Sequence, residues 1–331
     1  MDALTRIVVL GKTGIGKSSI ANTISGETVF EVDHSALSGT SECQAKNISV
    51  NGRSIKWIDT PGFFDTRRSE KEMKPEIVRC ITECAPGPHV FLIVLKVEKY
   101  TEHEQAVINK LQEYFSEEAL KYSIVLFTHG DQLAEGETIE QFVLRSKDLS
   151  DIVRKCECRC HIIDNKYWKN NQQDGYRSNQ FQVEELLKTI DKMIEANKGG
   201  YFTNEMLQEA NRKAEEEQER IRQSYPNMSL EEITQRAKTS VFENFWLKFA
   251  GGATAAALLV AFLVLTSLTP KPCFSPLSKG STVAQWAALW PQSKKGLDPR
   301  VPSHSSPQTL NNPLHPSTLD SFIPLTSIPP S

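Results

Sequence analysis

The chain has 331 residues, of which 39% are hydrophobic and 24% are charged, and its formal net charge at pH 7 is -3. These values are typical of an ordinary globular protein of about two domains, and they exclude a fibrous or wholly disordered chain. They also provide no global basic field, so nucleic acid is not expected as a partner.

The seven cysteines indicate a reducing compartment and free thiols, since the N-terminus leads straight into an apolar stretch without a secretory signal. Cys156, Cys158 and Cys160 alternate just before His161. Spacing with a period of two predicts one face of a β-strand over residues 158–163, because zinc sites normally use C-x₂₋₄-C turns.

Residues 11–18 read GKTGIGKS and match the phosphate-binding loop pattern G-x-x-x-x-G-K-[ST]. A predicted strand over residues 6–10 precedes the loop and a predicted helix from residue 17 follows it, as the pattern requires. Loop N–H groups would face the phosphates, Lys17 would supply a charge, and the Ser18 hydroxyl would bind Mg²⁺. The predicted nucleotide contacts here are Gly11, Lys12, Thr13, Gly14, Ile15, Gly16, Lys17, Ser18 and Ser19.

Strands and helices alternate from residue 4 to about residue 198, which predicts an α/β fold with a mostly parallel sheet covered on both faces. Further strands are predicted at 47–50, 54–59, 90–95, 123–127 and 158–163. Further helices are predicted at 70–83, 102–114, 138–146 and 183–197. Asn51-Gly52 predicts a hairpin and hence one antiparallel pair. Six strands in this order indicate the three-layer sandwich of P-loop GTPases.

Two further segments complete a predicted nucleotide switch. Thr40 lies in a polar stretch over residues 30–45 that reads as a mobile loop, and it is a candidate second Mg²⁺ ligand. The sequence DTPG at residues 59–62 ends a predicted strand, so the Asp59 carboxylate would hold Mg²⁺ through water and the Gly62 N–H would face the γ-phosphate. An ordinary β-turn is the alternative for the DTPG segment.

The predicted base site lies after the fifth and sixth strands. In the sequence THGD at residues 128–131, Asp131 can accept hydrogen bonds from guanine N1–H and the exocyclic amine, which adenine cannot supply. His129 can stack on the purine where these sites usually have a lysine stem. Asn165 is predicted to close over the base. Polar turns are the alternative for both segments.

These motifs resemble the GTPase of immunity-associated protein (GIMAP) family, the animal branch of the septin-related, avirulence-induced GTPases. The resemblance covers about residues 4–200 and includes SGTSECQ at 38–44, DTPGFFDT at 59–66, PGPHVFLIVL at 86–95 and YTE at 100–102. It implies a domain at residues 1–200 that binds GTP or GDP with Mg²⁺ and dimerises with itself or a related GTPase through the nucleotide face. It further implies attachment to an intracellular membrane and a role in lymphocyte survival or immune response.

Slow hydrolysis is expected because Phe63 stands where Ras-type GTPases place a water-orienting glutamine. Lys99 stands where the resembled family often has an arginine that reaches a partner's phosphates, and lysine lacks the bidentate fork. Lys99 is therefore either a weak catalytic residue or a solvated lysine. A GTP-dependent membrane scaffold with negligible hydrolysis is the alternative function. A P-loop ATPase or kinase is disfavoured by Asp131.

The C-terminal third changes in composition. Residues 201–248 form a charged extension with helices predicted at 204–223 and 230–245, the second with Ser229 as N-cap. The thin apolar stripe of the first helix favours a solvated single helix; the alternatives are a helix packed on the GTPase domain and one that pairs weakly with a partner. Residues 249–268 carry no charge and, at about 30 Å as a helix, predict a transmembrane segment with a buried or re-entrant helix as the alternative. Residues 269–331 are Pro/Ser-rich and predicted disordered. If residues 249–268 span a membrane, the GTPase domain would face the cytosol.

Overall fold

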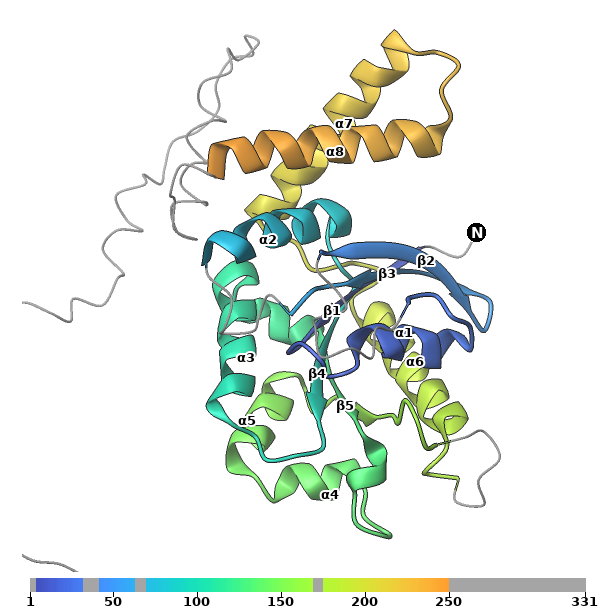
Figure 1. Ribbon diagram of the computed structural model, residues 1–331, viewed down its shortest axis with the longest axis vertical. Helices are drawn as coiled ribbons and strands as arrows, with labels where there is room; N and C mark the ends of the chain where they lie inside the picture. The colour runs from blue at the N-terminus through green and yellow to red at the C-terminus, as the bar shows by residue number, and fades with distance from the viewer. Residues whose placement is uncertain (1–3, 32–41, 63–69, 169–174, 250–331) are drawn as a thin grey trace, which may run out of the picture. The chain divides into compact units, whose positions relative to one another are not determined.

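The computed structural model describes residues 4–31, 42–62, 70–168 and 175–249, which all belong to one compact unit (Figure 1). Its centre is a six-stranded sheet in the order β2-β3-β1-β4-β5-β6. The strands are β1 (Thr5–Leu10), β2 (Gln44–Val50), β3 (Arg53–Asp59), β4 (Val90–Lys96), β5 (Ser123–Thr128) and β6 (Cys160–Ile162). All neighbours pair in parallel except β2 and β3, so the predicted architecture is confirmed.

Helices cover both faces of this sheet (Figure 1). The helices are α1 (Lys17–Ser25), α2 (Glu70–Cys84), α3 (Glu102–Phe115), α4 (Ile139–Leu144), α5 (Lys147–Lys155), α6 (Asn179–Ala196), α7 (Glu205–Ser224) and α8 (Leu230–Phe249), with short 3₁₀ helices η1 (Glu117–Tyr122) and η2 (Gly130–Gln132). Helices α1 and α6 share one apolar core, and α2, α3 and α5 share the other.

Alternation along the central strands divides the side chains between these two cores. In β4, Phe91 and Ile93 join the core under α2 and α3, whereas Leu92 and Val94 join the core under α1 and α6. Each of these side chains is fully buried, which stabilises the fold by about 1.5–3 kcal/mol per residue. Because both faces of β4 are covered, the strand is a continuous apolar run, as parallel central strands usually are.

The hairpin between β2 and β3 is also confirmed. Asn51 and Gly52 have φ angles of 49° and 79°, the left-handed pair that a two-residue type I′ turn needs. The register pairs Val50 with Arg53 across the turn. Strand β2 begins at Gln44, earlier than predicted, because its antiparallel pairing with β3 continues back to the pair of Gln44 and Asp59.

The cysteine-rich segment differs from the prediction of a strand over residues 158–163. Cys156 ends α5, and the left-handed φ of 59° at Cys158 turns the chain before β6, so only Cys160 lies in a strand. The physical reason is the helix before it: Leu149, Ile152 and Val153 are buried at helical spacing, and this stripe extends α5 to Lys155. The helix predicted at residues 138–146 is confirmed as α4, and α5, which follows it, was not predicted.

Helices α7 and α8 pack against each other and against α2. Every fourth residue of α8 is buried in the stripe Ile233, Ala237, Val241 and Phe245. The prediction of a solvated helix here is wrong, because Met206, Leu207 and Ala210 of α7 and Val241 and Phe245 of α8 belong to the core under α2 and α3. Ile233 and Ala237 pack instead with Ile221 of α7. The predicted N-cap is confirmed by the Glu232 N–H, which donates to Ser229 Oγ at 3.2 Å.

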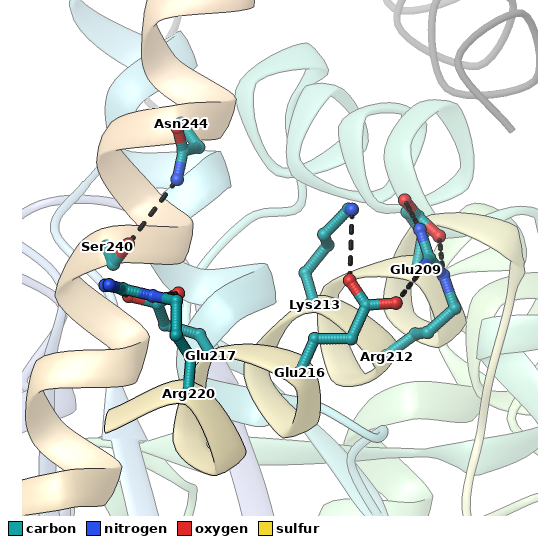
Figure 2. A network of polar contacts seen from close by, with 8 residues as sticks. All are labelled: Glu209, Arg212, Lys213, Glu216, Glu217, Arg220, Ser240 and Asn244. Carbon is teal, nitrogen blue, oxygen red and sulfur yellow. Dashed lines mark hydrogen bonds and ion pairs between the residues drawn. The ribbon is translucent and has the colours of Figure 1, made fainter. Parts of the chain in front are cut away.

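The charged residues of α7 largely satisfy one another. Figure 2 shows Arg212 between Glu209 and Glu216, while Arg220 bonds to Glu217 at 2.5 Å. These pairs lie three or four residues apart and are solvent-exposed on their basic side, so solvent screening leaves each of them only a small contribution to stability. Packing of the apolar stripe, rather than these ion pairs, therefore holds the extension in place.

Within residues 4–31, 42–62, 70–168 and 175–249, no helix is both long and apolar enough to span a bilayer. The predicted transmembrane segment at 249–268 starts at the last residue of α8 and otherwise lies outside those residues, as does the predicted disordered tail.

His89 links the stability of this fold to pH. Its Nδ1 accepts the Arg6 N–H at 2.9 Å, and burial, followed by the Arg6 charge, lowers the pKa of His89 to about 4. The unfolded chain takes up this proton from about pH 6.5 downwards. The free energy of unfolding should therefore fall by up to about 3 kcal/mol between pH 6.5 and pH 4.

Urea denaturation across that pH range, on wild type, His89→Gln and the exposed control His103→Gln, tests this expectation. Glutamine keeps an acceptor for the Arg6 N–H but does not titrate, so His89→Gln should flatten the slope while His103→Gln retains it. An unchanged slope in His89→Gln would assign the pH dependence to other groups.

Candidate functional site

The predicted phosphate loop runs from the end of β1 into α1, at the carboxyl edge of the sheet where β3 and β5 also end. Parallel strands bring their carboxyl ends to one edge, so residues distant in sequence meet there. Of the residues predicted at positions 11–19, residues 11–16 form the loop and residues 17–19 form the start of α1. Gly16 is the N-cap of α1, with a left-handed φ of 93°.

Lys17 is the most enclosed charge of this loop, with 6% of its surface exposed. Its Nζ donates to the carbonyl oxygens of Gly11 at 3.1 Å and Lys12 at 2.8 Å. The ammonium therefore lies inside the curve of the loop, where helix α1 also directs its first N–H groups. This concentration of positive potential suits a polyanion such as a di- or triphosphate.

Ser18 and Asp59, the two described residues that are predicted to hold Mg²⁺, are hydrogen-bonded to each other. Ser18 Oγ donates to Asp59 Oδ2 at 2.5 Å, although 41 positions separate the two residues. Asp59 is fully buried at the end of β3, and Thr60 beside it donates to the Val9 carbonyl at 2.5 Å. A hydroxyl and a carboxylate at the edge of a phosphate loop are the oxygen donors that Mg²⁺ prefers, so these residues fit the ion.

Two close approaches explain why glycine occupies positions 16 and 62. A Cβ on Gly16 would lie 2.7 Å from Asn165 Nδ2, and a Cβ on Gly62 would overlap Thr13 of the loop. Gly62 therefore lies directly against the phosphate loop, where the switch prediction puts it. Asn165 Oδ1 accepts from Thr23 Oγ1 at 2.8 Å, and its Nδ2 donates to the Gly16 carbonyl at 3.4 Å.

Thr128, at the end of β5, joins the predicted base site to the phosphate loop. Its buried hydroxyl donates to the carbonyl oxygens of Ile15 at 3.1 Å and Leu95 at 3.3 Å. His129 follows with a left-handed φ of 59° and is half-buried. Asp131 is exposed, so its carboxylate is available to a ligand.

Sequence reasoning missed three residues of the base site: Asp164, Trp168 and Asn179. Asp164 and Trp168 are 1% and 5% exposed, and both bond to Asn179 at the start of α6. Their bonds to Asp131 and Asn179 join residues 11 to 33 positions apart, so no local pattern identifies them. The sequence contains an Asp-Asn pair after β6, but the local pattern predicted a role only for Asn165.

Lys12 binds a residue outside the predicted loop. Its Nζ forms an ion pair with Glu104, which is 4% exposed and also accepts from the N–H and hydroxyl of Thr101 at 2.9 and 2.5 Å. Burial alone would raise the pKa of Glu104, but the bonds from Lys12 and Thr101 lower it. The capping box of α3 is thus fixed to the phosphate loop.

Lys99 lies two residues before Thr101 and is exposed. It takes part in a shallow pocket with Tyr100, Glu98 and Glu104, and the structure does not bring it onto the phosphate loop residues. The role predicted for Lys99 in a partner's site therefore stays a prediction. Thr40 and Phe63 lie outside the described residues.

Comparison with known proteins identifies relatives. A model described as the AIG1 family matches residues 5–222. Immune-associated nucleotide-binding protein 9 of Arabidopsis thaliana is 30% identical over 243 residues, covering 71% of this chain and 69% of that protein. GTPase IMAP family member 8 of Mus musculus is 31% identical over 194 residues, covering 57% of this chain and 27% of that protein.

Among solved structures, the fold is similar to Toc33 of Arabidopsis thaliana in complex with GDP and Mg²⁺, with 21% identity and a TM-score of 0.45 over 57% of this chain and 83% of that one. A similarity at this level does not indicate the ligand or partner of this chain.

Proposed function

This chain belongs to the AIG1 family, and from that premise we propose that it is a guanine-nucleotide switch that binds GTP or GDP with Mg²⁺. The family membership agrees with the resemblance to GIMAP proteins, and the names of its relatives include nucleotide-binding proteins and a GTPase. The observation that carries the proposal is the 2.5 Å bond between Ser18 and Asp59, because it joins the phosphate loop to the switch aspartate.

Each described site residue then has a distinct task. Lys17 and the loop N–H groups bind the phosphates, and Ser18 and Asp59 supply oxygen donors for Mg²⁺. Bound Mg²⁺ would neutralise charge between the outer phosphates. Asp131 accepts from guanine N1–H and the exocyclic amine, which gives preference over adenine.

We propose slow hydrolysis and GTP-dependent dimerisation through the nucleotide face as the finer function. Phe63 cannot orient a water molecule, so an isolated chain lacks the usual residue for that step. Lys99 is exposed and would be available to a partner. A GTP-dependent scaffold with negligible hydrolysis is the second candidate, favoured by lysine rather than arginine at position 99.

Nucleotide competition on the purified full-length chain tests the proposed guanine recognition. In competition against fluorescent mant-GDP, GDP should displace the probe at least about 100-fold better than ADP, and Asp131→Ala should remove most of this preference because two hydrogen bonds to a charged group are lost. Equal displacement by ADP would refute guanine recognition.

Single-turnover GTP hydrolysis measured across a series of protein concentrations separates the two candidates. A rate constant that rises with concentration supports dimer-activated hydrolysis, and Lys99→Ala should reduce the rise if Lys99 acts on the partner. A flat rate near the uncatalysed value would favour the scaffold.

We also propose attachment to an intracellular membrane through residues 249–268, with the GTPase domain in the cytosol, and a role in immune-cell regulation or survival. The uncharged composition of that segment and the names of the relatives support these proposals. Deletion of residues 249–268 should release the protein from carbonate-washed membranes. Retention of the deletion variant on membranes would contradict the anchor.

A further inference from the structure

Asp164 joins the two segments of the predicted base site. Its side chain is almost fully buried between residues 128–131, after β5, and residues 165–168, after β6. Oδ2 accepts the Asp131 N–H at 3.2 Å. Oδ1 accepts the N–H groups of Lys166, at 2.8 Å, and Tyr167. One carboxylate therefore determines the backbone path of both segments.

Asn179 holds Asp164 from the other side. Its Oδ1 accepts the Asp164 N–H at 3.0 Å, and its Nδ2 donates to the carbonyls of Asp164 at 2.6 Å and Trp168 at 2.9 Å. Trp168 packs so closely on Gly130 that a Cβ there would lie 2.5 Å from the indole. The two base-site segments are thus interlocked by packing as well as by hydrogen bonds.

The pKa values of the two carboxylates in this cluster, Asp164 and Asp131, are shifted in opposite directions. Burial alone would raise the pKa of Asp164, but the N–H groups of Tyr167, Lys166 and Asp131 outweigh this and lower it. The pKa of Asp131 is raised by its partial burial and by the neighbouring Asp164, with His129 opposing. The pKa of Lys166 is raised, first by its interaction with Tyr167 and to a smaller extent by the charges of Asp131 and Asp164. The ionised form is therefore favoured more strongly at Asp164 than at Asp131.

We propose that Asp164 is a positioning residue for guanine recognition, which presents Asp131 to the base by fixing the backbone on either side of it. The inference rests on the proposed function, since it concerns the same nucleotide site. Asp164 would not touch the base itself, because the contacts of its carboxylate are directed at the backbone N–H groups of Asp131, Lys166 and Tyr167 and at the Asp131 side chain.

The decisive test is the ratio of GDP to ADP affinity, measured by displacement of mant-GDP from the full-length chain. Asp164→Asn is isosteric but replaces one acceptor oxygen by a donor facing the Asp131 N–H. We expect GDP affinity to fall about ten- to hundred-fold, the equivalent of one or two hydrogen bonds to a charged group. ADP affinity, which depends on the phosphate loop, should change less than about three-fold, within ordinary scatter for an unaffected site. A purely structural loss would lower both equally.

Asn179→Ala provides a second route to the same result, since it removes the support of Asp164 without altering any carboxylate. Asp151→Asn, on the exposed end of α5 and paired with Arg154, is the matched control and should leave the ratio unchanged. Unchanged GDP/ADP ratios in both Asp164→Asn and Asn179→Ala would overturn the inference. If wild type itself failed to prefer GDP, the proposed function would fall instead, so the two failures are distinguishable.

Discussion

Replacement of Glu83 by glutamine is expected to lower the free energy of unfolding by about 2–4 kcal/mol, somewhat less than the loss typical of a fully buried ion pair. Glu83 Oε2 lies 2.8 Å from both Lys56 Nζ, on β3, and Lys238 Nζ, on α8. All three side chains are at most 19% exposed. Glutamine would leave two ammonium groups close together without a counter-charge.

The pKa directions in this cluster support that expectation. Burial, only partly offset by Glu83, lowers the pKa of Lys56 to about 8. Burial would raise the pKa of Glu83, yet the charges of Lys56 and Lys238 outweigh it and lower it. The carboxylate is therefore ionised at neutral pH, and it is the group that makes burial of the two lysines tolerable.

Urea denaturation at pH 7 measures the loss, and limited trypsin digestion should show faster cleavage in α7 and α8, because Lys238 connects α8 to α2 through Glu83. Glu118→Gln is the control: its pair with Lys121 is exposed, so its effect should stay within about 0.5 kcal/mol. Adding Lys238→Met to Glu83→Gln should recover about 1 kcal/mol or more by removing one of the two positive charges. Additive losses in the double variant would contradict the shared-charge explanation.

The attachment of α8 was predictable in part. Ile233, Ala237, Val241 and Phe245 recur every four residues, a spacing that indicates one buried helix face. The sequence cannot identify which surface that face covers, since Lys238 and Glu83 are 155 positions apart. The thin stripe in α7 was misleading for a related reason: its buried residues lie at the two ends of the helix, around Leu207 at the main core and at Ile221 against α8.

Local chemistry explains why the sequence alone indicates the phosphate side of the predicted site. The loop from Gly11 to Ser18 is contiguous, and its glycines, lysine and serine each have a defined role within one turn. Asp59 was predictable because it ends a strand parallel to β1, and parallel strands end at the same edge of a sheet. The base side depends instead on long-range contacts such as Trp168 on Gly130, which leave no periodic signal.

The cysteine segment shows how two patterns compete. Residues 156–160 alternate with a period of two, but Leu149, Ile152 and Val153 just upstream have helical period and a serine N-cap at Ser146. The helix prevails because it buries three apolar side chains, whereas extending β6 back to residue 158 would add little apolar burial. Left-handed backbone at residues 157 and 158 then reverses the chain into β6.

Replacement of Lys17 and of Ser18 should separate phosphate binding from metal binding. Lys17→Ala removes the enclosed ammonium, so GTP affinity should fall at least about 100-fold whether Mg²⁺ or EDTA is present, since charge-assisted bonds to phosphate are lost. Ser18→Ala removes only the hydroxyl that lies 2.5 Å from Asp59. Its GTP affinity should match wild type in EDTA and be about ten-fold weaker in Mg²⁺, the equivalent of one metal-ligand contact.

Displacement of mant-GTP by GTP in the two buffers gives both numbers for each variant. Ser25→Ala is the matched control for Ser18→Ala, because it removes a hydroxyl from the last residue of α1, at the opposite end of the helix from the phosphate loop. A four-way comparison of wild type, Lys17→Ala, Ser18→Ala and Ser25→Ala then tests the meaning of the Ser18–Asp59 bond. If Mg²⁺ strengthened GTP binding equally in Ser18→Ala and wild type, the bond would be a structural link between β3 and α1 rather than part of a metal site.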